Sequence, residues 1–229
     1  MAVAFVESGR RSPIIDTRGK THTHIDRQTR GYKKDDPTTK HEKALPPRVF
    51  RHRMAIAVLP RERARAVLVS GALFFAMRSC EYTYVGKAER KTRAIRVCDI
   101  VFRNGAQVVH HDDPNLHLAD TVDITFGDQK SNIKDKTVSQ DRTEDPTLNP
   151  VALYAETIQR VMNYPGAVST WEIYTFHDGR VFTKISSKEI LRDIRVSVDM
   201  IGKDILGFSS DDTGTHSVRA SFAMMAYLA

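Results

Sequence analysis

The sequence predicts an α+β fold that is mainly helical and carries small antiparallel β-hairpins. Hydrophobic residues make up 41% of the 229 residues, which suffices for a packed core. Long stretches of strong helix formers alternate with short β-branched stretches, and the dipeptides Asn104-Gly105 and Asp178-Gly179 mark tight turns between strands. This length suits one medium domain, or one domain with a fragment of a second.

Four helices are predicted from their start and stop signals. The run Pro60–Arg78 begins with a proline at the first position and is apolar enough to be largely buried. Asn149-Pro150 supplies a cap and a first residue for the next helix, and Ser186–Gly202 begins with a Ser-x-x-Glu capping box. A last helix is predicted to open at Thr215. The predicted apolar faces are Val151, Ala155, Ile158 and Met162; Ile190, Ile194, Val198 and Ile201; and Val218, Phe222 and Met225.

The strands are predicted from β-branched residues and alternation. Arg93–Phe102 is rich in β-branched residues and precedes the turn Asn104-Gly105. Apolar and polar residues alternate along Thr121–Phe126, which is typical of a half-buried strand, and Thr137-Val138 is expected to start the strand that returns. Asp178-Gly179 lies between two further β-rich stretches and predicts a separate hairpin.

Positive charge is concentrated at the start of the chain. Residues 1–53 hold 13 Lys/Arg against 6 Asp/Glu, whereas residues 54–229 hold 22 of each sign. A basic segment on a neutral body favours a polyanion partner such as DNA or RNA, although a solvated basic tail would have the same charge. The composition divides the chain into a basic tail at residues 1–36, a proline-containing linker at residues 37–53 and a domain at residues 54–229.

Several classes of protein are disfavoured. The longest apolar run, Ala64–Met77, is too short for a membrane span, and the N-terminus lacks the apolar stretch of a signal peptide. The two cysteines, Cys80 and Cys98, have no metal-ligand spacing around them. We therefore expect an intracellular protein in a reducing compartment, with no membrane association.

Two short motifs combine residue types that bind anions. Arg78 and Glu81 are spaced i and i+3, so the carboxylate would hold the guanidinium. His216 and Arg219 have the same spacing at a predicted helix start, where backbone N–H groups and the helix dipole favour a phosphate. Taken singly, the first motif is more typical of an ordinary ion pair at a helix end, and the second of a capped helix with two solvated side chains.

In this order, the motifs resemble those of the tyrosine recombinases of the phage-integrase type, and most closely the recombinase-like proteins of eukaryotic mobile elements. The pieces that carry the resemblance are GALFFAMRSCEY and GTHSVRASFAMMAYLA, supported by ITFGDQKSNIKDKTVSQ and RGYKKDDP. The resemblance extends from Arg30 to Ala229. It implies a recombinase-like catalytic domain, preceded by the remnant of a core-binding domain in residues 1–36.

The resemblance also implies catalytic roles for particular residues. Arg78 and Arg219 would bind the scissile phosphate and stabilise its transition state, and Glu81 would support Arg78. Lys130, or alternatively Lys134, would protonate the leaving oxygen, with His216 assisting proton transfer. No metal and no other cofactor is implied. The basic residues expected to contact DNA nearby are Lys87, Arg90, Lys91, Arg93 and Arg96.

The chain departs from the family pattern after Arg219. In the family, a further His or Trp and then the nucleophilic tyrosine follow this helix, whereas here the sequence ends at Ala229. Tyr227 lies roughly 12 Å further along the same helix, so we expect a core or surface role for it. Trp171 precedes His216, the wrong order for the family's late Trp, and is expected in the core. The catalytic domain is thus expected to be incomplete at its C-terminal end.

Three functions follow from these observations. The first is a tyrosine-recombinase-like protein of DNA integration and recombination, which in intact relatives cuts and rejoins strands through a phosphotyrosine. The second is a DNA-binding remnant of a mobile element without chemistry. The third is an unrelated basic interaction domain. The first two predict DNA as the partner and the nucleus as the location, and they leave open a homo-oligomer assembled on DNA.

Overall fold

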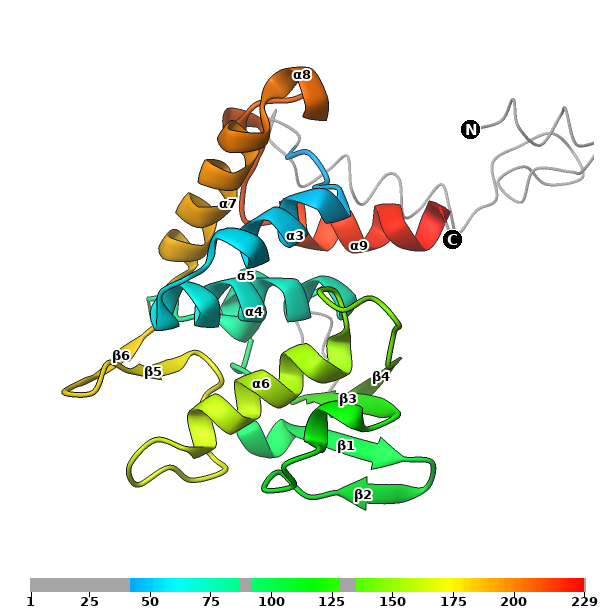
Figure 1. Cartoon of the computed structure of the whole chain (residues 1–229), viewed down its shortest axis with the longest axis vertical. Coiled ribbons are helices and arrows are strands. Elements are labelled where there is room, and N and C mark those ends of the chain that lie inside the picture. Colours follow the sequence, from blue (N-terminus) through cyan, green and yellow to red (C-terminus); the bar gives the residue numbers. More distant parts are fainter. Residues whose placement is uncertain (1–41, 87–91, 128–134, 229) are drawn as a thin grey trace, which may run out of the picture. The chain divides into compact units, whose positions relative to one another are not determined.

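The fold is described from a computed structural model, which covers residues 42–86, 92–127 and 135–228 (Figure 1). These residues belong to one compact unit, Glu42–Ala229. The α-helices are α3 (Pro47–Ile56), α4 (Pro60–Phe74), α5 (Ser79–Tyr82), α6 (Pro150–Met162), α7 (Ser187–Ile201), α8 (Lys203–Leu206) and α9 (Ser217–Leu228). The strands are β1 (Ile100–Asn104), β2 (Gln107–Val109), β3 (Thr121–Phe126), β4 (Lys136–Asp141), β5 (Thr175–His177) and β6 (Phe182–Lys184). The predicted α+β class, mainly helical with small antiparallel sheets, is confirmed.

The larger sheet has four antiparallel strands in the order β2-β1-β3-β4. The predicted hairpin is present, but Asn104 is the last residue of β1 and pairs with Gln107, so Gly105-Ala106 form the turn; Gly105 has a φ of 55°, which glycine adopts without steric cost. Strand β3 covers the predicted Thr121–Phe126 and pairs with β4. The cross-strand pair Phe102 and Val122 is fully buried, so this face of the sheet contributes to the core.

Helix α4 lies at the centre of the helical layer and is buried along most of its length. It contacts α3, α6, α7 and α9, and α6 in turn packs against β3 and β4 (Figure 1). The Tyr154 ring on α6 lies so close to Gly71 on α4 that a Cβ at Gly71 would be 3.0 Å from it. The glycine therefore lets the two helices approach closely.

The predicted starts of the middle helices are confirmed. Asn149 caps α6 by accepting hydrogen bonds from Val151 N and Ala152 N. The capping box of α7 is also present, and α7 ends at Gly202, whose φ is 90°. Asp178-Gly179 lies between β5 and β6, which form the predicted separate hairpin. These features depend on hydrogen bonds within a few residues, which is why the sequence signals identify them.

Three predicted boundaries differ in the structure. Helix α4 ends at Phe74 instead of Arg78, because Ala76 has a φ of 48° and interrupts the helix. Of the predicted linker at residues 37–53, residues 47–53 belong to α3, since Val49 and Phe50 pack in the core. In the predicted strand Arg93–Phe102, residues 97–99 form a 3₁₀ turn and β1 starts only at Ile100.

Candidate functional site

Neighbours of the two sequence motifs line one small, mainly apolar pocket between α5, α7 and the start of α9, whereas the charged side chains Arg78, His216 and Arg219 are not part of its lining. Ser79, directly after Arg78, lines this pocket. Gly214 and Thr215, directly before His216, line it from the other motif, together with Val218. Helix α7 contributes Ser187, its first residue, and the apolar side chains of Ile190, Leu191 and Ile194. Segments about 135 residues apart in the sequence are thereby adjacent in the fold.

Arg78 is held by Glu81, as the i, i+3 spacing predicts. The buried Glu81 carboxylate accepts hydrogen bonds from Arg78 N at 2.7 Å and from Arg78 Nη1 at 3.2 Å. The Arg78 side chain keeps 26% exposure against 4% for Glu81. Arg78 lies at the N-cap of the short helix α5 and not at the end of the long buried helix. A guanidinium has five N–H donors, so Arg78 can bind a phosphate while it remains paired with Glu81.

The helix that carries the second motif begins two residues later than predicted. Helix α9 opens at Ser217 and not at Thr215. The backbone N–H of Gly214 donates to Ser217 Oγ, and the N–H of His216 donates to the Glu42 carboxylate at 2.5 Å. The N-terminal end of α9 is thus capped by a side chain that comes from far away in the sequence, which local sequence signals do not reveal.

The side chains of His216 and Arg219 are exposed to solvent. The Glu42 carboxylate lies beside the backbone N–H of His216. An anion is therefore already present at this helix start, where the dipole favours one. No sequence signal identifies Glu42, because nothing in its neighbourhood links it to a residue 174 positions away.

The basic residues predicted to contact DNA or to protonate the leaving oxygen divide into two groups. Arg93 and Arg96 both bind Asp99, whose carboxylate is buried: Arg93 Nη2 at 2.9 Å and Arg96 Nη2 at 3.1 Å. Their side chains remain 42% and 31% exposed, so they can still face a polyanion, although with part of their charge neutralised. The other residues predicted for this region lie outside the described residues: Lys87, Arg90, Lys91, Lys130 and Lys134.

Two tyrosines bear on the chemistry of the pocket. Tyr227 is 65% exposed on α9, which makes it a surface residue. Tyr82 lines the pocket, but burial raises the pKa of its phenol, and the nearby Cys80 and Glu81 raise it further. A phenol that resists deprotonation is a poor nucleophile. Trp171 is partly buried and packs against the core, as expected.

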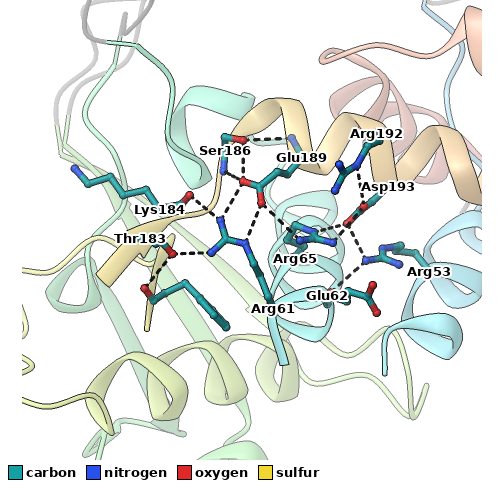
Figure 2. Close-up of polar contacts among 11 residues, drawn as sticks. Arg53, Arg61, Glu62, Arg65, Thr183, Lys184, Ser186, Glu189, Arg192 and Asp193 are labelled. Atoms are coloured by element: carbon teal, nitrogen blue, oxygen red, sulfur yellow. Dashed lines mark hydrogen bonds and ion pairs between the residues drawn. The ribbon is translucent and has the colours of Figure 1, made fainter. Parts of the chain in front are cut away.

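A network of buried ion pairs fixes α7 against α3 and α4 (Figure 2). Asp193 on α7 accepts hydrogen bonds from Arg53 Nη2 at 2.7 Å and from Arg65 Nε at 2.5 Å. All three side chains are almost completely buried. Because a buried charge is stable only when it is paired, this network fixes the position of α7 relative to its neighbours.

The network continues to the β5–β6 hairpin through Arg61. Its guanidinium binds the Glu189 carboxylate at 2.9 Å, Thr183 Oγ1 at 2.6 Å and the Lys184 carbonyl at 3.1 Å (Figure 2). Burial alone would raise the pKa of Glu189, but hydrogen bonds from Arg61 and Ser186 outweigh it and lower this pKa to about 2. Arg61 thereby ties the hairpin to the start of α7, next to the pocket.

Within the described segments, no group of three or more His, Cys, Asp or Glu side chains is arranged to hold a metal ion. None of the helices in these segments has the length and apolarity that a membrane crossing requires. Comparisons with protein-family models, with curated proteins and with solved structures found no match.

Proposed function

We propose that this chain binds DNA, with Arg78, His216 and Arg219 forming a phosphate site of the tyrosine-recombinase type. The observation that carries the proposal is that the two motif segments are neighbours in the fold: Ser79, next to Arg78, and Thr215, next to His216, line the same small pocket. Arginine suits this role because its planar fork makes bidentate contacts with phosphate. The Glu81 carboxylate preorganises one of the two arginines.

The electrostatics support a polyanion as the ligand. The net charge of +7 is that of a protein attracted to nucleic acid, and the basic residues of positions 1–53 account for all of it. Phosphate contacts release counterions, so affinity for DNA should fall steeply as salt rises and should depend little on sequence. Participation in DNA integration or recombination, as in the family that the sequence resembles, is part of the same proposal.

A DNA-binding role without strand cleavage is the second candidate function. The Tyr82 phenol at the pocket is buried with a raised pKa, and Tyr227 is on the surface of α9. Neither tyrosine is suited to attack a phosphate at the pocket, which favours DNA binding without covalent chemistry. The two candidates differ in a single measurable product, a protein–DNA adduct.

The test of DNA binding is a salt titration with duplex DNA. We expect Arg78→Ala and Arg219→Ala each to weaken binding and to reduce the slope of log affinity against log salt by about 0.9, the value of one phosphate contact. Arg192→Ala is the matched control, since Arg192 is 69% exposed on α7 and lies 4.0 Å from Asp193. If all three variants behave alike, or if binding is indifferent to salt, the proposed phosphate site is wrong.

A further inference from the structure

The β5–β6 hairpin carries a cluster of aromatic rings at the molecular surface. The Phe182 ring is 4.4 Å from that of His177 and 5.1 Å from that of Trp171, measured between centroids. The Tyr164 ring contacts both His177 and Phe182. Phe182 remains 49% exposed, and Val181 beside it 55%. The rings hold Phe182 in place while leaving half of it open to solvent.

Exposed cations lie on the same hairpin and at the start of the helix that follows it. Lys184 Nζ is 5.1 Å from the ring of Tyr84, which is 39% exposed, and Figure 2 shows its side chain extending away from Arg61. Arg180, at the hairpin turn, and Lys188, in the first turn of α7, are also exposed. Asp178 is the acidic residue exposed within this stretch, so positive charge predominates. A surface of aromatic faces and cations matches a polyanion that carries planar bases.

The hairpin is also continuous with the candidate phosphate site. Tyr84, six residues after Arg78, donates its backbone N–H to the Ile185 carbonyl, and Ser187 N donates to the Tyr84 carbonyl. Ser187 lines the pocket together with Ser79. From Ser187 back to Phe182 an extended chain spans about 16 Å, a distance that a few nucleotides of single-stranded DNA can cover.

We propose that the β5–β6 hairpin is a stacking platform for unpaired DNA bases, with Phe182 presenting its exposed ring and Lys184, held beside the Tyr84 ring, contacting the adjacent phosphate. This inference rests on the proposed function, because the strand is expected to continue from the phosphate site. Stacking on Phe182 needs bases that are not paired, so the platform selects single-stranded DNA or an unpaired segment within a duplex.

Trp171 provides a direct reporter, because it is the single tryptophan of the chain and lies against Phe182. A short oligodeoxythymidylate should quench Trp171 emission on titration, whereas a blunt duplex should bind with little quenching. Phe182→Leu, which keeps apolarity but removes the ring, should weaken oligodeoxythymidylate binding roughly tenfold and leave duplex binding unchanged. Phe182→Trp, which introduces a second tryptophan, should retain wild-type affinity when binding is measured by anisotropy of a labelled oligonucleotide.

Lys184→Gln should lower the salt slope for the single strand by about 0.7. The matched controls are Met200→Leu, at an apolar residue 61% exposed on α7, and Lys203→Gln, at an exposed lysine on α8; neither should alter binding. Far-UV circular dichroism and the thermal midpoint of each variant establish that it is folded.

The outcomes separate the two proposals. If duplex DNA binds with the expected salt dependence but Phe182→Leu changes nothing and Trp171 is not quenched, the platform is wrong and the proposed function stands. If neither form of DNA binds at low salt, both fail. If Phe182→Leu leaves DNA binding intact but abolishes self-association in sedimentation, the aromatic cluster is a protein contact and the inference is overturned.

Discussion

The Asp193 carboxylate on α7 accepts a 2.7 Å hydrogen bond from Arg53 Nη2 on α3, and both side chains are at least nine-tenths excluded from solvent. The residues are 140 positions apart in the sequence. Arg65 on α4 binds the same carboxylate and also lies 3.6 Å from that of Glu189. The Asp193 carboxylate thus joins three helices, α3, α4 and α7.

We expect Asp193→Ala to destabilise the fold by about 3–5 kcal/mol, because it removes the carboxylate of the buried Arg53 and leaves the buried Arg65 only the longer contact with Glu189, at 3.6 Å. The free energy of unfolding from urea titration measures this effect. Arg192→Ala removes a neighbouring charged side chain that is 69% exposed and should cost less than about 0.5 kcal/mol. Equal destabilisation by the two variants would show that the network has no special role.

Glu189 should make stability depend on acid pH. Its pKa is lowered from the usual 4.5 to about 2 in the folded protein, so the unfolded chain takes up the proton first. The stabilisation is therefore fully present above about pH 4.5 and is lost as the pH falls towards 2. Because the pair is partly exposed to solvent, we expect the loss to be about 1 kcal/mol.

Urea titrations over this acid range check the effect. Glu189→Gln should be less stable at neutral pH and should show a flatter decline below about pH 4.5. A decline as steep as that of the wild type would assign the acid sensitivity to other carboxylates, such as Asp145. The pKa of Asp145 is also lowered to about 2. Hydrogen bonds from Arg51 and from Leu148 N lower it and outweigh the opposing effect of burial.

Glu81→Gln should weaken both the fold and DNA binding. The buried carboxylate holds the Arg78 backbone and guanidinium, and an amide makes weaker, uncharged hydrogen bonds to them. We expect a stability loss of about 1–3 kcal/mol and a lower affinity for duplex DNA. Arg78→Ala should then add little further loss of affinity in the Glu81→Gln background; additive losses would mean that Glu81 does not act through Arg78.

Glu42→Gln should have opposite effects on stability and on binding. The amide oxygen can still accept the hydrogen bond from His216 N, but the negative charge at the start of α9 is removed. We expect a stability loss of about 0.5–1 kcal/mol, from the weaker interaction with the helix dipole. Affinity for DNA should rise a few-fold, since an anion next to His216 and Arg219 no longer repels phosphate. A fall in affinity would argue against phosphate binding at this helix start.

Tyr227→Phe should leave every DNA-dependent activity unchanged. The residue is 65% exposed and lies about 12 Å along α9 from the first turn, too far to attack a phosphate held there. The assay is a nicked suicide DNA substrate followed by a denaturing gel. A protein–DNA adduct that disappears in Tyr227→Phe would contradict this assignment and would make Tyr227 the nucleophile.

The sequence by itself determined the features that depend on neighbouring residues. The α+β class, the cap of α6 at Asn149, the capping box of α7 and the turns at Asn104-Gly105 and Asp178-Gly179 all follow from local hydrogen bonds and glycine conformations. The pairing of Arg78 with Glu81 was predictable for the same reason, since three residues separate them.

Only the tertiary structure decided which distant groups meet. The Glu42 carboxylate caps α9, Asp193 joins Arg53 and Arg65, and Asp99 binds Arg93, a residue that the sequence suggested for DNA contact. The break in the long helix at Ala76 was equally hidden. The charge or hydrophobicity of a residue shows that it needs a partner or burial. The packing of the whole core selects that partner, because a buried charge is compensated by the group that the fold brings next to it.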